Sequence, residues 1–356
     1  MSFITGLFRK EKKTESVVLI DVSASSVAGA YVRYAEDEMP TLLYTRHLPI
    51  EIRANEPRER AMLRALTILG DALICEGAPV LLRATGSGTA DTILVSVNAP
   101  WQTTSVRTEY FEGETSFLFT KQLVAETLKQ TSFAPPGKML ADESIIGTIL
   151  NGYETHDPYG KNAHRASIVI LTSLIDKKVV ESINVLVRKI FHTKYVISIA
   201  GSSLRYQAMR AAFSHERDAL ILDATELFTA IALVRRDLLV NVADIPSPTN
   251  DPAAWLAKVS FALAELAERF PLPRTIFLLA REQDSAGLRE ALDAAKFGTL
   301  WLSDNPPKII SVQGSHIGNM VRQATTVIPD LQILLMALYY SRRAFGYGIL
   351  DAYAHT

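Results

Sequence analysis

The stretch Val17-Val18-Leu19-Ile20-Asp21 is an apolar run, rich in β-branched residues, that ends in a carboxylate. Small and hydroxyl-bearing residues follow from Val22 to Ser26, and Val27-Ala28-Gly29-Ala30-Tyr31-Val32 is a second apolar run. This pattern predicts two strands joined by a tight turn, with Asp21 at the end of the first strand. The folded part of the chain is therefore expected to begin with a β-hairpin.

The same arrangement returns roughly two hundred residues later. Ala219-Leu220-Ile221-Leu222-Asp223 is again an apolar run closed by an aspartate, and Ala230-Ile231-Ala232-Leu233-Val234 follows after a short polar interval. Arg235-Arg236-Asp237 predicts a turn into a further strand, Leu238 to Val242. Two units of strand, aspartate, turn and strand in one chain indicate an internal duplication.

The two units resemble the phosphate loops of the actin-like ATPase superfamily, which read Asp-Ile-Gly-Thr/Ser-Ser in the first half and Asp-Ile-Gly-Gly-Gly in the second. Within that superfamily the sequence is most similar to the group of the cell-division protein FtsA and the pilus assembly protein PilM. Asn151-Gly152-Tyr153, Asp157-Pro158 and Gly160-Lys161 resemble the signature of that group's inserted subdomain, a small β-α-β-β fold termed SHS2. The resemblance runs from about Val17 to Arg343, by order of elements more than by identity.

The remaining segments follow the order of elements in that group. The predicted strands are Thr92 to Val97, Thr103 to Phe111, Ala166 to Leu171 and Thr275 to Leu279. The predicted helices are Phe117 to Lys129, Lys177 to Phe191, Leu204 to Phe213 and Asp330 to Arg343, together with one that carries Trp255, Val259, Leu263, Leu266 and Phe270.

The resemblance implies an α/β fold, namely an actin-like, ribonuclease H-like duplicated β-sheet with helices, an inserted SHS2-type β-α-β-β subdomain and a reduced second half. The predicted parts are a basic amphipathic N-terminal segment (1–16), a first actin-like subdomain (17–88), the inserted subdomain (89–195), a second actin-like subdomain (196–343) and a C-terminal tail (344–356). Only about fifty residues separate Asp223 from Thr275, where the family fits a whole subdomain that closes over the adenine. One wall of the nucleotide cleft is therefore expected to be missing or much reduced.

The resemblance also implies where a nucleotide would be held. Asp21 and Asp223 take the positions of the carboxylates that hold magnesium in the family. If a nucleotide binds, the positions around it are Asp21, Ser23, Ser25, Ser26, Asp223, Thr225, Glu226, Ala280 and Arg281. No residue is assigned a catalytic role.

The three nucleotide loops depart from the family in the same way, because each lacks its glycines. In active members a glycine lets backbone N–H groups approach the phosphates, and any side chain blocks that approach. This chain has Ser23-Ala24 in the first loop, Thr225-Glu226-Leu227 in the second and Ala280-Arg281-Glu282-Gln283 in the adenosine loop. Glu226 would also bring a negative charge toward the polyphosphate.

Three interpretations stay open at this point. The first is a non-catalytic or weakly nucleotide-binding scaffold or adaptor of a membrane-associated assembly, in cell division or a type IV pilus-like machinery; it is a pseudo-ATPase for which no cofactor is predicted, although ATP and magnesium are possible. The second is a divergent ATPase in which Asp21 and Asp223 hold magnesium while Ser23, Ser25, Ser26 and Thr225 donate hydroxyl hydrogen bonds to ATP. The third is a structural protein that has lost both nucleotide and polymerisation. Without a nucleotide, each aspartate caps the turn that follows it.

The resemblance implies that the inserted subdomain binds the cytoplasmic segment of a membrane protein, and it allows a homo-oligomer or filament. Trp101 and Tyr153 lie beside turns of that subdomain and are predicted partner-binding anchors if exposed, or core residues if buried. The N-terminal segment pairs apolar with basic residues. It is interpreted either as a weak contact with an anionic membrane or as a solvated terminus, and its contact residues would be Phe3, Leu7, Phe8, Arg9 and Lys10.

Composition excludes several other classes. The 37 Lys plus Arg and 38 Asp plus Glu leave a net charge of -1, which argues against a nucleic-acid binder. The single Cys75 excludes a disulfide scaffold and is expected to be buried in an apolar run. The apolar runs fall short of the roughly 20 residues of a membrane span, and no signal peptide is recognised. The predicted location is the cytoplasm, peripherally at the inner face of the membrane.

Other sites are not supported by the sequence. The seven histidines show no metal-ligand spacing, so no metal site is predicted apart from the two aspartates. Ser202 and Ser203 lack the surroundings of a nucleophile and are expected to cap the helix that starts near Leu204.

Overall fold

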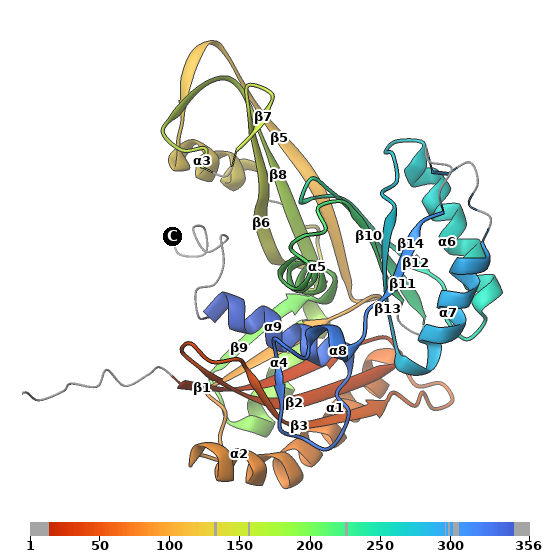
Figure 1. The fold of residues 1–356 in the computed structure, drawn as a ribbon. Coiled ribbons are helices and arrows are strands. Elements are labelled where there is room, and N and C mark those ends of the chain that lie inside the picture. Colours follow the sequence, from red (N-terminus) through yellow and green to blue (C-terminus); the bar gives the residue numbers. More distant parts are fainter. Residues whose placement is uncertain are drawn as a thin grey trace, which may run out of the picture.

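The computed structural model describes residues 14–131, 134–155, 157–224, 227–295, 297, 300–301 and 306–344. The first sheet consists of β1 (Thr14–Val22), β2 (Ser26–Ala35), β3 (Thr41–Pro49), β4 (Thr92–Val97), β9 (Tyr195–Ala200) and β15 (Arg322–Gln323). The second sheet consists of β10 (Ala219–Ala224), β11 (Phe228–Arg235), β12 (Leu238–Pro246), β13 (Thr275–Ala280) and β14 (Lys308–Ser311). The two sheets form the two halves of the molecule (Figure 1).

The two sheets share one topology. In the first, β1 pairs antiparallel with β2 and parallel with β4, while β3 and β9 extend the two sides. In the second, β10 pairs antiparallel with β11 and parallel with β13, while β12 and β14 extend the two sides. The orders β3-β2-β1-β4-β9 and β12-β11-β10-β13-β14 are therefore equivalent. The predicted duplication is confirmed.

Helices form three layers around these sheets. One face of the first sheet is covered by a continuous helical stretch of α1 (Arg58–Ala72), the π-helical turn η1 (Leu73–Gly77) and α2 (Ala78–Thr85), together with α4 (Lys177–Phe191). Between the two sheets lie α5 (Gly201–Ala212) and α9 (Leu331–Ala344), beside the short α8 (Gly314–Ile317). The outer face of the second sheet is covered by α6 (Pro252–Ala267) and α7 (Glu282–Ala294).

The apolar residues of β1 alternate between two cores. Val17 and Leu19 pack with α5 and α9 in the core between the sheets, whereas Val18 and Ile20 pack with α1 and α4 on the other face. A strand that is buried on both faces needs apolar residues at every position, since successive side chains point to opposite faces. This double burial explains why the sequence of β1 is an unbroken apolar run.

The inserted subdomain projects from the body as a separate sheet with one helix (Figure 1). It consists of β5 (Gln102–Phe119), α3 (Lys121–Thr131), β6 (Lys138–Leu150), the short β7 (Tyr153–Glu154) and β8 (Lys161–Asp176). Its antiparallel strands take the order β5-β8-β6-β7. The helix follows the first strand, as in the predicted β-α-β-β order, and β7 is an addition.

Part of the predicted helix in this subdomain is strand. Phe117 to Phe119 belong to β5, which resumes pairing with β8 after an irregularity between Glu112 and Phe117. The prediction of a helix from Phe117 is wrong because the buried ring of Phe119 packs edge-on against Phe111 in the subdomain core. Tertiary packing thus overrides the helical spacing of the apolar residues.

The helical stretch Arg58–Thr85 bears on two expectations from the sequence. Its 28 residues include a window with mean hydropathy 1.7, so within the described part of the chain it is long and apolar enough for a membrane span, although Asp71 and Glu76 interrupt its apolar runs. Its inner face, with Met62, Leu66 and Leu69, packs on the first sheet, and 39% of the apolar window is buried. Cys75 is exposed, since η1 turns Leu73 and Gly77 inward instead.

Candidate functional site

The two candidate aspartates occupy equivalent places in the two halves. Asp21 pairs across the hairpin with Ala28, and Asp223 pairs with Ala230 in the second hairpin. Each lies one residue before the end of its strand, and their exposed fractions are 7% and 4%. Because α5 runs between the sheets, its first turns lie between these two carboxylates.

An arginine on α5 occupies the space between the aspartates. Arg205 Nε donates a hydrogen bond to Asp223 Oδ2, and Arg205 Nη1 lies 4.0 Å from Asp21 Oδ1. Arg205 Nη2 donates to Asn98 Oδ1 at 2.6 Å, and Asn98 Nδ2 donates to Asp21 Oδ1 at 3.0 Å. The guanidinium therefore acts as the counter-ion of both carboxylates, at the place where the resemblance implies a magnesium ion.

Negative charge exceeds positive charge in this buried cluster. Burial raises the pKa of Asp223 against the opposing effect of Arg205, and Asp21 raises it further. Asp223 Oδ1 accepts no hydrogen bond within the described part of the chain. Burial, followed by the charge of Asp223, raises the pKa of Asp244 on β12 to about 6. Three carboxylates thus share one arginine.

A polar network joins this cluster to the inserted subdomain. Gln102 Nε2 donates to Asp244 Oδ2 at 3.0 Å, and Gln102 Oε1 accepts from Thr104 Oγ1 at 2.9 Å and Ser202 Oγ at 3.0 Å. The prediction that Ser202 and Ser203 cap α5 is wrong, because both are buried inside its first turn. Ser203 Oγ instead donates to Asp142 Oδ2 on β6 at 2.6 Å. The start of α5 is therefore a junction between the first half, the second half and the inserted subdomain.

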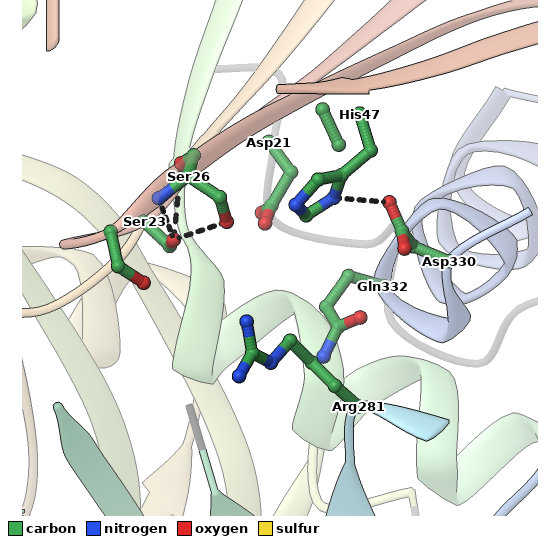
Figure 2. A pocket seen from close by; sticks show the side chains of 9 residues that line it. Asp21, Ser23, Ser26, His47, Arg281, Asp330 and Gln332 are labelled. Atoms are coloured by element: carbon green, nitrogen blue, oxygen red, sulfur yellow. Dashed lines mark hydrogen bonds and ion pairs between the residues drawn. The ribbon is translucent and has the colours of Figure 1, made fainter. Parts of the chain in front are cut away.

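A small cavity lies beside the cluster. It has a volume of about 30 Å³, and its lining includes Asp21, Ser23, Ser25, Ser26, Ala28, His47, Arg281, Asp330 and Gln332. Figure 2 shows Ser23 and Ser26 turned toward each other at one side and Arg281 and Gln332 at the other. The oxygen atoms Ser23 Oγ and Ser26 Oγ are 3.0 Å apart, and Ser26 N donates to Ser23 Oγ at 3.1 Å. These hydroxyls satisfy each other within the hairpin turn.

A histidine and an aspartate close another side of the cavity. His47 Nδ1 on β3 lies 2.8 Å from Asp330 Oδ2, next to the start of α9 (Figure 2). The hydrogen bond to Asp330 raises the pKa of His47, although partial burial opposes this. Arg281 is held by Asp284 on α7, at 2.8 Å between Nη2 and Oδ2. Each charged group around the cavity therefore has a partner, either in the lining or just outside it.

The residues in this arrangement do not fit a magnesium nucleotide. Sites for small ligands usually measure about 300–1,000 Å³, which is at least ten times the volume found here. Arg205 fills the position between the two aspartates, and Arg281 lines the cavity where phosphates would enter. Ala280 is buried at the end of β13, paired with Ala224.

The structure brings together most, but not all, of the predicted positions. Asp21, Ser23, Ser25, Ser26 and Arg281 line one cavity, and Asp223 joins Asp21 through Arg205. Thr225 and Glu226 lie outside the described residues, as do the membrane-contact residues Phe3, Leu7, Phe8, Arg9 and Lys10. No group of three or more His, Cys, Asp or Glu side chains that could hold a metal is found in the described part of the chain.

Sequence reasoning missed the residues around the aspartates. Arg205 on α5 and Asn98, directly after β4, hold the two carboxylates, while Asp244 on β12 and His47 on β3 lie beside them, and none of the four carries a motif. The sequence held one indication that Arg205 is buried, because this charged residue lies between Leu204 and Tyr206 in a segment of apolar character. A buried arginine normally has an acidic partner, and Asp21 and Asp223 were the candidates.

The two predicted partner-binding aromatics differ in exposure. Trp101 is only 8% exposed and belongs to the core under the first sheet, so the prediction that it is an exposed anchor is wrong. Tyr153 is 79% exposed on β7, which pairs with the end of β6 in the inserted subdomain. Its role as an anchor stays a prediction.

Comparison with known structures identifies the architecture. A chain of the PilM–PilN type IV pilus biogenesis complex matches 92% of this chain and 98% of its own length, with a TM-score of 0.57 and 11% sequence identity. The protein has the actin-like ATPase fold. A protein of unknown function with an actin-like ATPase fold from Bacteroides thetaiotaomicron matches 91% of this chain and 95% of its own length, with a TM-score of 0.46 and 9% identity. No protein-family model and no curated protein sequence match this chain.

The actin-like fold explains why the two aspartates meet. Each half of such a fold supplies one hairpin, and the halves face each other across α5 and α9. In this actin-like chain the described stretch between β12 and β13 contains one helix, α6, in agreement with the predicted reduction of the second half.

Proposed function

We propose that this chain is an actin-like scaffold of a membrane-associated assembly and that it works without efficient ATP hydrolysis. The observation that carries the proposal is the ion pairing of Arg205 with Asp21 and Asp223. A magnesium ion needs these carboxylate oxygens as ligands, and a guanidinium between them competes with it both sterically and electrostatically.

The kind of assembly is inferred from likeness. One solved chain that resembles this chain over nearly its whole length belongs to a PilM–PilN type IV pilus biogenesis complex. We extend this to a role in a pilus-like or cell-division machinery, at the cytoplasmic face of the membrane, with the cytoplasmic segment of a membrane protein as partner. The projecting inserted subdomain and the exposed Tyr153 on its strand β7 support a binding role for that part.

Calorimetric titration with Mg-ATP tests the absence of nucleotide binding. We expect no binding heat with the wild-type chain, and no phosphate release in a coupled assay. The divergent ATPase would instead give micromolar binding that Asp21→Asn and Asp223→Asn each abolish. Asp71→Asn, an exposed aspartate on α1, is the matched control and would leave such binding intact.

A further inference from the structure

A second concave surface lies at the tip of the inserted subdomain, away from the aspartate cluster. We call it the tip groove; it lies between the end of β5 and the first turns of α3. Its volume is about 510 Å³, within the roughly 300–1,000 Å³ range of ligand sites. It is lined by Tyr110, Phe111, Glu112, Gly113, Phe117, Leu118, Thr120, Gln122, Leu123 and Glu126.

The lining of the tip groove combines exposed apolar side chains with polar and acidic ones. Tyr110 and Leu118 are 75% and 52% exposed, so two large apolar side chains of the groove face solvent. Glu112 and Glu126 are both exposed, and the lining contains no lysine or arginine. Exposed apolar surface with a charged rim is typical of a binding site for a protein segment.

Glu112 and Glu126 form no ion pair in the described part of the chain, although Arg165 lies opposite Glu112 in the pairing of β5 with β8. Lys121, at the start of α3, places its ammonium 5.6 Å from the centre of the Tyr159 ring, and Tyr159 stacks on Phe119. Glu126 Oε1 accepts a hydrogen bond from the neutral amide of Gln122 at 2.9 Å. The occupant that suits this surface therefore combines apolar side chains with positive charge.

One segment of this chain has that chemistry. In the sequence of residues 1–13, Phe3, Ile4, Leu7 and Phe8 recur at the spacing of an amphipathic helix, and the basic Arg9, Lys10, Lys12 and Lys13 follow with the single Glu11. An amphipathic helix that lays its apolar face into a groove is a common mode of peptide recognition. The apolar residues would meet Tyr110 and Leu118, and the basic residues would meet the carboxylates of the rim.

We infer that the tip groove binds residues 1–13 of a second copy of this chain. The described chain starts with β1 in the body, whereas the groove lies at the far end of the projecting subdomain (Figure 1). A contact between two different surfaces of identical subunits does not close on itself unless the rotation allows a ring, so it joins copies head to tail. This inference goes beyond the proposed function, because it holds whether or not a nucleotide binds.

Sedimentation of the full chain over a range of concentrations tests the inference. We expect the wild type to associate, and excess synthetic peptide of residues 1–13 to dissociate the complex. Glu112→Lys/Glu126→Lys is expected to weaken association about tenfold or more, because close charge pairs at interfaces are worth about 1.5 kcal/mol upward. The matched control Glu265→Lys/Glu290→Lys makes the same charge change at exposed positions of α6 and α7 and is expected to associate as the wild type does.

Exchanging the charges of the two partners distinguishes a direct contact between residues 1–13 and the tip groove from an effect of overall charge. Arg9→Glu/Lys10→Glu is expected to weaken association as the groove variant does, and the combination of both changes in one chain is expected to restore it. Circular dichroism checks that each variant is folded. A wild type that stays monomeric at about 100 µM, or a control variant as weak as the groove variant, overturns the inference.

Flotation with anionic phosphatidylglycerol vesicles tests whether residues 1–13 bind a membrane instead of the tip groove. If the wild type floats, the Arg9→Glu/Lys10→Glu variant does not, and neither changes its oligomeric state, then residues 1–13 bind lipid and the inference is wrong.

Discussion

Replacement of Arg205 by methionine removes the counter-ion from the aspartate cluster while keeping most of the buried volume. The side chains of Arg205 and Asp223 are both 5% exposed, so water cannot take over the solvation of the carboxylate. Breaking such a buried pair costs about 3–5 kcal/mol, because the partner is left charged and unpaired. We expect Arg205→Met to lower the free energy of unfolding by that amount at pH 8.

The loss is expected to depend on pH in a defined direction. The pKa of Asp223 is already raised by burial, and removal of Arg205 raises it further because the arginine opposes this shift. A carboxyl group whose pKa is higher in the folded than in the unfolded protein stabilises the fold at pH values below its pKa in the unfolded state. This contribution disappears as the pH rises through its pKa in the folded state. The deficit of the variant should therefore shrink between pH 8 and pH 5.

A double-mutant cycle with Asp223→Asn measures the interaction itself. Asparagine removes the charge at nearly constant shape, so Arg205→Met should cost less in the Asp223→Asn background, by about 2–3 kcal/mol. Guanidinium titrations followed by circular dichroism give the four stabilities. A cost of Arg205→Met below about 1 kcal/mol, or equal costs in both backgrounds, would show that Arg205 is not the counter-ion of Asp223.

Three further predictions concern the surroundings of this cluster. Because the pKa of Asp244 is raised to about 6, the stability that this carboxyl contributes is lost as the pH rises from about 4 to 7. Asp244→Asn should therefore make the free energy of unfolding less dependent on pH in this range, and raise it by up to about 3 kcal/mol at pH 8. A Cβ at Gly201 would lie 1.7 Å from Asn98 Oδ1, so Gly201→Ala should displace that side chain and lower the free energy of unfolding by about 1–3 kcal/mol, measured by denaturant titration. The pKa of His47, raised by Asp330, should fall in Asp330→Asn when followed by proton NMR; an unchanged titration curve would contradict the hydrogen bond.

The local patterns of the sequence were sufficient for the two hairpins and for several helices. α4 spans Lys177–Phe191 as its spacing of apolar residues predicts, because Val179, Val180, Ile183 and Val187 form one buried face. The aspartates at the strand ends were found for a similar reason, since an unbroken apolar run followed by a carboxylate and small residues is a local signal. The same two runs predicted the duplication, which the equivalent strand orders of the two sheets confirm.

Errors arose where a residue's surroundings come from distant parts of the chain. Cys75 is exposed on the outer side of a π-helical turn although burial was expected, and the sequence left open whether Trp101 is exposed, whereas it lies buried under the first sheet. Phe119 is in a strand because Phe111 and α3 enclose its ring. None of these contacts leaves a periodic signal in the neighbouring sequence.

The sequence by itself determined the two strand–aspartate–turn units and the loss of glycine from all three loops, because both are properties of adjacent residues. Only the tertiary structure decided what holds the aspartates. Arg205 lies on a helix far along the chain from Asp21, and it reaches both carboxylates because α5 packs between two sheets of equivalent topology. A buried charge requires a partner, but which residue supplies it depends on how the elements pack.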